Sequence, residues 1–140
     1  MGEQRHTHSW AKGMNAEFAS IFSRLRVILQ KHAGVLSVTV DAPKHYCLSV
    51  DYSAKLKKGF PAAWVKVGKG YVSYHFMPVY MFPKLHDGLS KELRARMQGK
   101  SCFNFKRADE VLFQEVAEMT AEGFAMAQKA GFGPAEKKVR

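Results

Sequence analysis

The sequence predicts an α+β domain, in which a largely antiparallel sheet of about five strands has the N- and C-terminal helices packed on one face. Apolar residues recur at helical spacing near both ends of the chain. Between these segments, apolar and polar residues alternate at the spacing of strands, and most connections between the expected strands are short, which favours antiparallel pairing. The expected order of elements is α-β-β-β-β-α-β-α.

The first helix is expected at residues 16–32, with Asn15 as its N-terminal cap and Gly34 at its end. Its apolar stripe consists of residues three or four positions apart, namely Phe18, Ile21, Phe22, Leu25 and Leu29. A first strand is expected at 35–40 and, after a turn at 41–44, a second at 46–53. In the second strand, the apolar side should consist of Tyr46, Leu48, Val50 and Tyr52.

The third and fourth strands are expected at 62–67 and 71–77, after a charged loop at 55–59. Between them lies Gly68-Lys69-Gly70, whose glycines can supply the positive φ that hairpin loops use. The sequence therefore predicts a β-hairpin here.

The C-terminal third should contain a short helix, a fifth strand and a long helix. The short helix is expected at 90–98, capped by Ser90 and ended by Gly99, and the strand at 101–105. Asp109 should open the last helix, which Gly131 ends.

The apolar segment at 77–83 contains Pro78 and Pro83, so we expect an extended crossing segment here rather than a central strand. An extended chain cannot turn all of its apolar side chains inward, and a twofold homodimer would bury those left exposed. The alternative is a lid that folds onto its own sheet. The candidate interface residues are Trp64, Val79, Tyr80, Met81 and Phe82.

One domain is expected at 14–131, between a flexible leader at 1–13 and a basic tail at 132–140. The leader is polar, and no apolar run approaches the roughly 20 residues of a membrane helix, so we expect a cytoplasmic protein without membrane contact. Cys47 and Cys102 are the only cysteines, too few for a disulfide framework.

The net charge of +10 is concentrated in residues 44–107, where 13 Lys and Arg residues accompany three acidic ones. A positive field of this kind favours anionic partners. We therefore expect a small anionic ligand or a protein partner, with nucleic acid ranked below them.

Pleating should divide the strand side chains between two faces. The face toward the helices should carry Leu36, Val38, Tyr46, Leu48, Val50, Val65, Val72, Tyr74, Phe76, Phe103 and Phe105. The opposite face, which includes Cys47, should be polar, as an antiparallel sheet can be where it simply faces water. From it we select as candidate ligand-binding residues Lys66, Ser73, His75, Cys102, Asn104 and Lys106.

An enzyme that uses His75 with Cys102 or Ser73 is an alternative. A catalytic histidine needs a carboxylate to orient it, and the nearest strand carboxylate, Asp51, is expected two strands away. We predict no catalytic residue, no cofactor and no metal site. His6 and His8 form an isolated pair in the leader, and such pairs bind metals weakly without supporting contacts.

Two segments resemble the YdhG-like bacterial domains of unknown function: VGKGYVSYHFMPVY at 67–80 and MQGKSCFNFK at 97–106. The resemblance covers about residues 16–123 and implies a small α+β sandwich. Some relatives are labelled iron chaperones through a distant likeness to frataxin. For this chain, that label implies an iron site on the helical row Glu115, Glu118 and Glu122.

The leading functional hypothesis is a non-enzymatic cytoplasmic binding or interaction module, whose polar sheet face holds a small anionic ligand or a protein partner. The alternatives are the small enzyme and a protein that delivers iron or another metal.

Overall fold

The computed structural model describes residues 15–132, so the expected leader and all but the first residue of the expected basic tail lie outside the described part of the chain. One antiparallel sheet has the strand order β1-β2-β3-β4-β6-β5. Its strands are β1 (Ser37–Ala42), β2 (His45–Ser53), β3 (Lys58–Val67), β4 (Val72–Phe76), β5 (Met97–Gln98) and β6 (Cys102–Phe105). The predicted α+β class is confirmed, with six described strands in place of about five.

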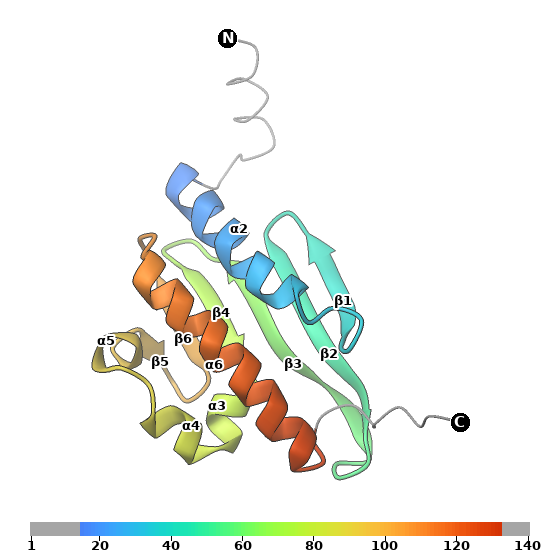
Figure 1. The fold of residues 1–140 in the computed structure, drawn as a ribbon. Coiled ribbons are helices and arrows are strands. Elements are labelled where there is room, and N and C mark those ends of the chain that lie inside the picture. The colour runs from blue at the N-terminus through green and yellow to red at the C-terminus, as the bar shows by residue number, and fades with distance from the viewer. Residues whose placement is uncertain (1–14, 133–140) are drawn as a thin grey trace.

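Two long helices, α2 (Ala16–Gln30) and α6 (Glu110–Lys129), lie side by side across one face of the sheet (Figure 1). The short helices between β4 and β5 are α3 (Met77–Met81), α4 (Pro83–Asp87) and α5 (Lys91–Arg94). Each of them contacts α6 and so lies on the same side. Within residues 15–132, no helix covers the other face of the sheet, and none is long and apolar enough to cross a membrane.

Helix α2 begins as the sequence predicts, because the Asn15 side chain accepts a hydrogen bond of 2.7 Å from the backbone N–H of Phe18. It ends at Gln30, two residues earlier than expected, and Gly34 then takes a φ of +100° that favours glycine. Its buried side chains form the predicted stripe with Ile28 added: Phe18, Ile21, Phe22, Leu25, Ile28 and Leu29.

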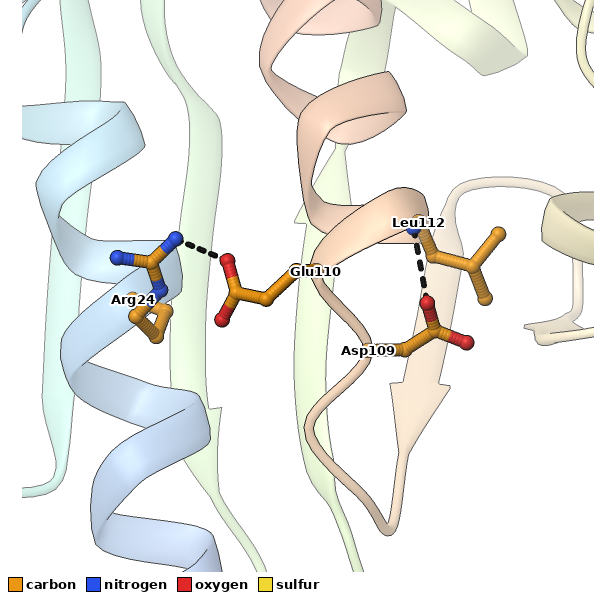
Figure 2. Close-up of polar contacts among 4 residues, drawn as sticks. All are labelled: Arg24, Asp109, Glu110 and Leu112. Atoms are coloured by element: carbon orange, nitrogen blue, oxygen red, sulfur yellow. Dashed lines mark hydrogen bonds and ion pairs between the residues drawn. The ribbon is translucent and has the colours of Figure 1, made fainter.

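Helix α6 is capped by Asp109, whose carboxylate accepts a hydrogen bond of 3.1 Å from the backbone N–H of Leu112 (Figure 2). In the same turn, Glu110 forms an ion pair with Arg24, which joins the two long helices (Figure 2). Deeper in the core, the Tyr74 hydroxyl of β4 shares a hydrogen bond of 2.6 Å with Thr120 of α6.

The predicted division of side chains between the two faces holds for ten of the eleven residues expected toward the helices. Those that are buried are Leu36, Tyr46, Leu48, Val50, Val65, Val72, Tyr74, Phe76, Phe103 and Phe105. Val38 is the exception. It pairs with the buried Leu48 and so shares its face, but 42% of its surface is exposed because β1 is an edge strand of the sheet.

A register shift changes the end of β2. It lies between Val50 and Ser53, in the pairing with β3, and reverses the expected alternation. Tyr52, predicted on the apolar side, is therefore 53% exposed, whereas Ser53 is fully buried and donates a hydrogen bond of 3.1 Å to the Gly131 carbonyl.

The predicted hairpin joins β3 to β4, with Val67 paired to Val72. The loop closes through a hydrogen bond of 2.8 Å from the Gly68 N–H to the Tyr71 carbonyl. The prediction of a positive φ at Gly68 and Gly70 is wrong, because among the described glycines only Gly34, Gly99 and Gly131 have a positive φ.

The prediction of an extended crossing segment at 77–83 is wrong, because these residues form helix α3 and the start of helix α4, with only Phe82 extended between them. A proline lies in the first turn of each: its fixed φ suits a helix, and the first turn has no partner for its missing N–H. Folding into helices buries Val79, leaves Met81 and Phe82 half-buried and leaves Tyr80 58% exposed.

The short helix expected at 90–98 is shorter in the structure than the sequence predicts. Ser90 caps it as predicted, by accepting a hydrogen bond of 3.0 Å from the Leu93 N–H, but α5 ends at Arg94. Met97 and Gln98 form β5, which pairs with β6. Gly99 therefore lies in the turn of a second hairpin, with a φ of +77°, and does not end a helix.

Candidate functional site

The sheet face opposite the long helices carries most of the residues that the sequence selects for ligand binding. We call it the polar face and define it by two rows of side chains that run across the strands. Each row takes one residue from each of β2, β3, β4 and β6. The first row is His45, Lys66, Ser73 and Asn104, and the second is Cys47, Trp64, His75 and Cys102.

In the first row, the polar side chains are joined by hydrogen bonds at one end. The Ser73 hydroxyl donates to Asn104 Oδ1 at 2.8 Å, and Asn104 Nδ2 donates to Gln98 Oε1 at 2.8 Å. Lys66, opposite both Ser73 and His45, is exposed. The row thus places a solvated ammonium group beside an ordered chain of hydrogen-bonding groups.

In the second row, the rings of Trp64 and His75 stack, with centroids 4.9 Å apart and an angle of 12° between their planes. The ring of His45 approaches the indole edge-on, with centroids 6.0 Å apart. These contacts fix the orientation of His75.

His75 also contacts the turn before β6. Its Nδ1 lies 3.1 Å from the Ser101 hydroxyl oxygen and 3.5 Å from the Cys102 sulfur. Both groups can donate a hydrogen bond, and we assign Nδ1 as the acceptor. In the tautomer assigned in this way, the neutral ring carries its proton on Nε2.

Burial favours the uncharged forms of His75 and Cys102 in the second row. It lowers the pKa of His75 and raises that of the Cys102 thiol, although the hydrogen bond with Ser101 opposes the rise at Cys102. Burial, and after it the charge of Lys66, lowers the pKa of His45. Near neutral pH, the two histidines are therefore neutral, and the positive charge of the two rows comes from Lys66.

Five of the six candidate ligand-binding residues lie in these two rows, and Lys106 does not. It follows the last residue of β6 and lines a cavity of about 450 Å³ at the start of α6, together with Arg96 and Arg107. The acidic Glu92 and Asp109 line the same cavity. The basic residues of the middle segment are thus divided between different surfaces.

The candidate interface residues are also separated. Trp64 lies on the polar face and stacks on His75. Val79 is 3% exposed and packs into the core, and Phe82 lies against Phe132 with ring centroids 6.3 Å apart. Among these residues, Tyr80 offers the largest exposed surface.

Sequence reasoning missed His45, Ser101 and Gln98, all of which touch the candidate site. His45 shares the face of Cys47 by simple alternation, but the second strand was expected to begin one residue after it. Ser101 and Gln98 gave no such signal, because they flank a turn of a hairpin that the sequence pattern did not show.

The acidic row on α6 is engaged with its neighbours. Glu115 accepts hydrogen bonds from the Ser90 N–H at 2.7 Å and the Ser90 hydroxyl at 2.6 Å, and Glu118 accepts one of 3.2 Å from Gln114. Together with Glu122 and Lys84 they line a cavity of about 130 Å³. Among residues 15–132, no group of three or more His, Cys, Asp and Glu side chains is arranged to hold a metal ion, and His6 and His8 lie outside that range.

No protein-family model matches the chain, and no significant match was found among curated proteins or solved structures.

Proposed function

We propose that the protein is a binding module and that its polar face holds a small anion. The observation that best supports this is the position of Lys66, whose exposed ammonium group lies between His45 and Ser73 on neighbouring strands. The row crosses four strands of one sheet, and groups held on strands keep their positions better than groups on loops.

In this proposal, Lys66 attracts the anion and the neutral histidines donate hydrogen bonds to it. Nε2 of His75 carries the ring proton and so can donate to an anion oxygen. A bound anion also favours the protonated form of His45, whose pKa the charge of Lys66 helps to lower. Anion binding is therefore expected to raise the pKa of His45.

Thermal-shift measurements with inorganic phosphate and citrate test the proposal. Each anion should raise the Tm of the protein along a saturable curve, and Lys66→Ala should remove most of the rise. Lys69→Ala is the matched control, because Lys69 lies at the tip of the β3–β4 hairpin and should leave the rise intact. The proposal is to be given up if neither anion raises the Tm or if the two variants respond alike.

A second candidate function is a small enzyme in which Cys102 is the nucleophile and His75 its base. The 3.5 Å contact between their side chains favours it. Burial disfavours it, because a raised thiol pKa and a lowered imidazole pKa both oppose formation of the reactive thiolate.

Alkylation of Cys102 by iodoacetamide, measured in a Cys47→Ala background, distinguishes the two functions. An enzyme of this kind requires Cys102 to react faster than a free cysteine at pH 7. A simple binding face predicts a slower reaction, because the thiol is half-buried and protonated.

Membership of the YdhG-like family stays a prediction, with the α+β fold in agreement. Iron delivery, which that resemblance suggests, would have to use Glu115 while two hydrogen bonds from Ser90 occupy its carboxylate. Anaerobic calorimetry with ferrous iron tests this function. If no heat of binding is measured at micromolar protein, iron delivery is excluded.

A further inference from the structure

A second candidate site lies between the short helices and the turn that joins β5 to β6, and none of its lining residues belongs to the two rows of the polar face. It is a cavity of about 290 Å³. Its apolar wall consists of Val79, Pro83 and Met97, from α3, α4 and β5. This volume lies just below the range of about 300–1,000 Å³ that is typical of ligand pockets, so it suits only a small molecule.

Three side chains at this cavity can form polar contacts with a ligand: Tyr80, His86 and Lys100. Within residues 15–132, neither the Tyr80 hydroxyl nor the Lys100 ammonium group has a hydrogen-bond or ion-pair partner. His86 is engaged, because its Nδ1 lies 3.1 Å from a carboxylate oxygen of Asp87. Among the described residues, none of those that line the cavity is acidic.

The lining therefore combines an apolar wall with an unpaired cation and an unpaired phenol. A ligand that satisfies both parts has a compact apolar body and one negative group, and a carboxylate can accept hydrogen bonds from ammonium and phenol groups together. We propose that this cavity binds a small amphipathic carboxylate, with its apolar body against Val79, Pro83 and Met97 and its carboxylate toward Lys100 and Tyr80. This cavity shares no lining residue with the two rows of the polar face, so binding at each site can be tested separately.

This site also gives the exposed ring of Tyr80 a role. A ring that is 58% exposed beside an apolar cavity has a free surface for a ligand to cover. Val79, which the sequence suggested as part of a dimer interface, instead forms part of the cavity wall. A bound carboxylate would thus cover a surface that otherwise faces water.

Titration by NMR with three probes tests the proposal: benzoate, benzyl alcohol and acetate. Benzoate should bind in the millimolar range or tighter and shift the signals of Tyr80, Met97 and Gly99. Benzyl alcohol lacks the charge and acetate lacks the apolar body, so each should bind at least tenfold more weakly. No saturable shift with benzoate, or equal binding of benzyl alcohol, overturns the proposal.

Variants at exposed positions assign the binding to this cavity. Lys100→Gln should weaken benzoate binding at least fivefold, and Lys100→Arg should restore it. Tyr80→Ala should weaken it as well, whereas Lys69→Gln is the matched surface control and should change nothing. Equal affinities of Lys100→Gln and the wild type overturn the proposal.

Two further measurements distinguish this carboxylate site from the anion site of the polar face and from a dimer interface. Lys66→Ala should abolish the phosphate response of the polar face and leave benzoate binding intact, so that either site can fail alone. Light scattering of the free protein should give a mass near the 15.8 kDa of one chain. A doubled mass that returns to one chain in Tyr80→Glu would assign this surface to a second copy and overturn the ligand proposal.

Discussion

Gly123 of α6 lies against the ring of Phe76 of β4, so closely that a β-carbon on Gly123 would be 2.5 Å from Phe76 Cε2. The same β-carbon would lie 2.9 Å from Leu85 Cδ2. All three residues are buried, so the neighbours have little room to move. Glycine at this position lets α6 pack directly on the centre of the sheet.

Gly123→Ala should therefore destabilise the protein. Alanine gains about 1 kcal/mol of helix propensity over glycine, but overpacking a core costs about 1–3 kcal/mol. We expect the cost to exceed the gain, and the free energy of unfolding from urea denaturation measures the result. In a double-mutant cycle, Phe76→Leu should remove part of the cost, and fully additive effects would contradict this explanation.

The contact of Ser90 with Glu115 predicts a loss of stability at the short helices. Ser90→Ala removes the cap of α5 and one of the two hydrogen bonds to Glu115, so we expect a loss of about 1–2 kcal/mol in the free energy of unfolding. Glu115→Gln should destabilise as well. Glu118→Gln, on the same helix at an exposed position, is the control and should change stability by less than about 0.5 kcal/mol.

The buried hydrogen bond between Tyr74 and Thr120 predicts a non-additive pair. Thr120→Val keeps the shape but leaves the Tyr74 hydroxyl buried without a partner, which costs about 1–3 kcal/mol. Adding Tyr74→Phe removes the unpaired hydroxyl and should recover much of that loss. Thermal denaturation of the single and double variants measures the coupling, and a double variant less stable than Thr120→Val would contradict it.

The lowered pKa of His75 predicts how stability depends on pH. The folded protein binds fewer protons at this site than the unfolded chain, so stability rises with pH. The contribution is complete above the unfolded pKa of about 6.5 and is lost as the pH falls from there through the folded pKa.

Urea denaturation at pH 7.5 and pH 5.5 tests whether the free energy of unfolding rises with pH. The wild type should lose stability at the lower pH, and His75→Gln should lose less than the wild type. Part of the loss should persist in the variant, because burial also lowers the pKa of His32 and His45. An equal pH dependence in both proteins would show that His75 does not titrate with a lowered pKa.

Most of the fold could be predicted from the sequence, because alternation and helical spacing are strong in the elements that form the core. The residues Tyr46, Leu48 and Val50 of β2 illustrate this, since strict alternation determined their face correctly. Alternation failed at Tyr52, where a register shift in the pairing with β3 changes which face the side chain takes. It placed Val38 on the face of its partner Leu48, but an edge strand leaves Val38 exposed. The sequence of one strand does not show how its neighbour pairs.

The segment after β4 differs from its prediction for another reason. Proline is unfavourable inside a strand, which predicts a crossing segment, but it is favourable in the first turn of a helix, where Pro78 and Pro83 lie. Five of the candidate ligand-binding residues fell on one face because pleating places alternate residues together. The contact of His75 with Ser101 could not be predicted in the same way, because it depends on a turn whose hairpin has a strand of two residues.

Helix α6 follows every strand that the structure describes, and this order has a consequence for synthesis of the protein. The rings of Phe76 and Phe105 rest on Phe124 and Phe113 of α6, with centroid distances of 5.1 Å and 5.3 Å. A ribosome adds about 5–20 residues per second, so for several seconds the strands emerge with these rings facing water. Apolar surface exposed in this way binds chaperones or other nascent chains. The growing polypeptide should therefore depend on chaperones until its last helix has left the exit tunnel.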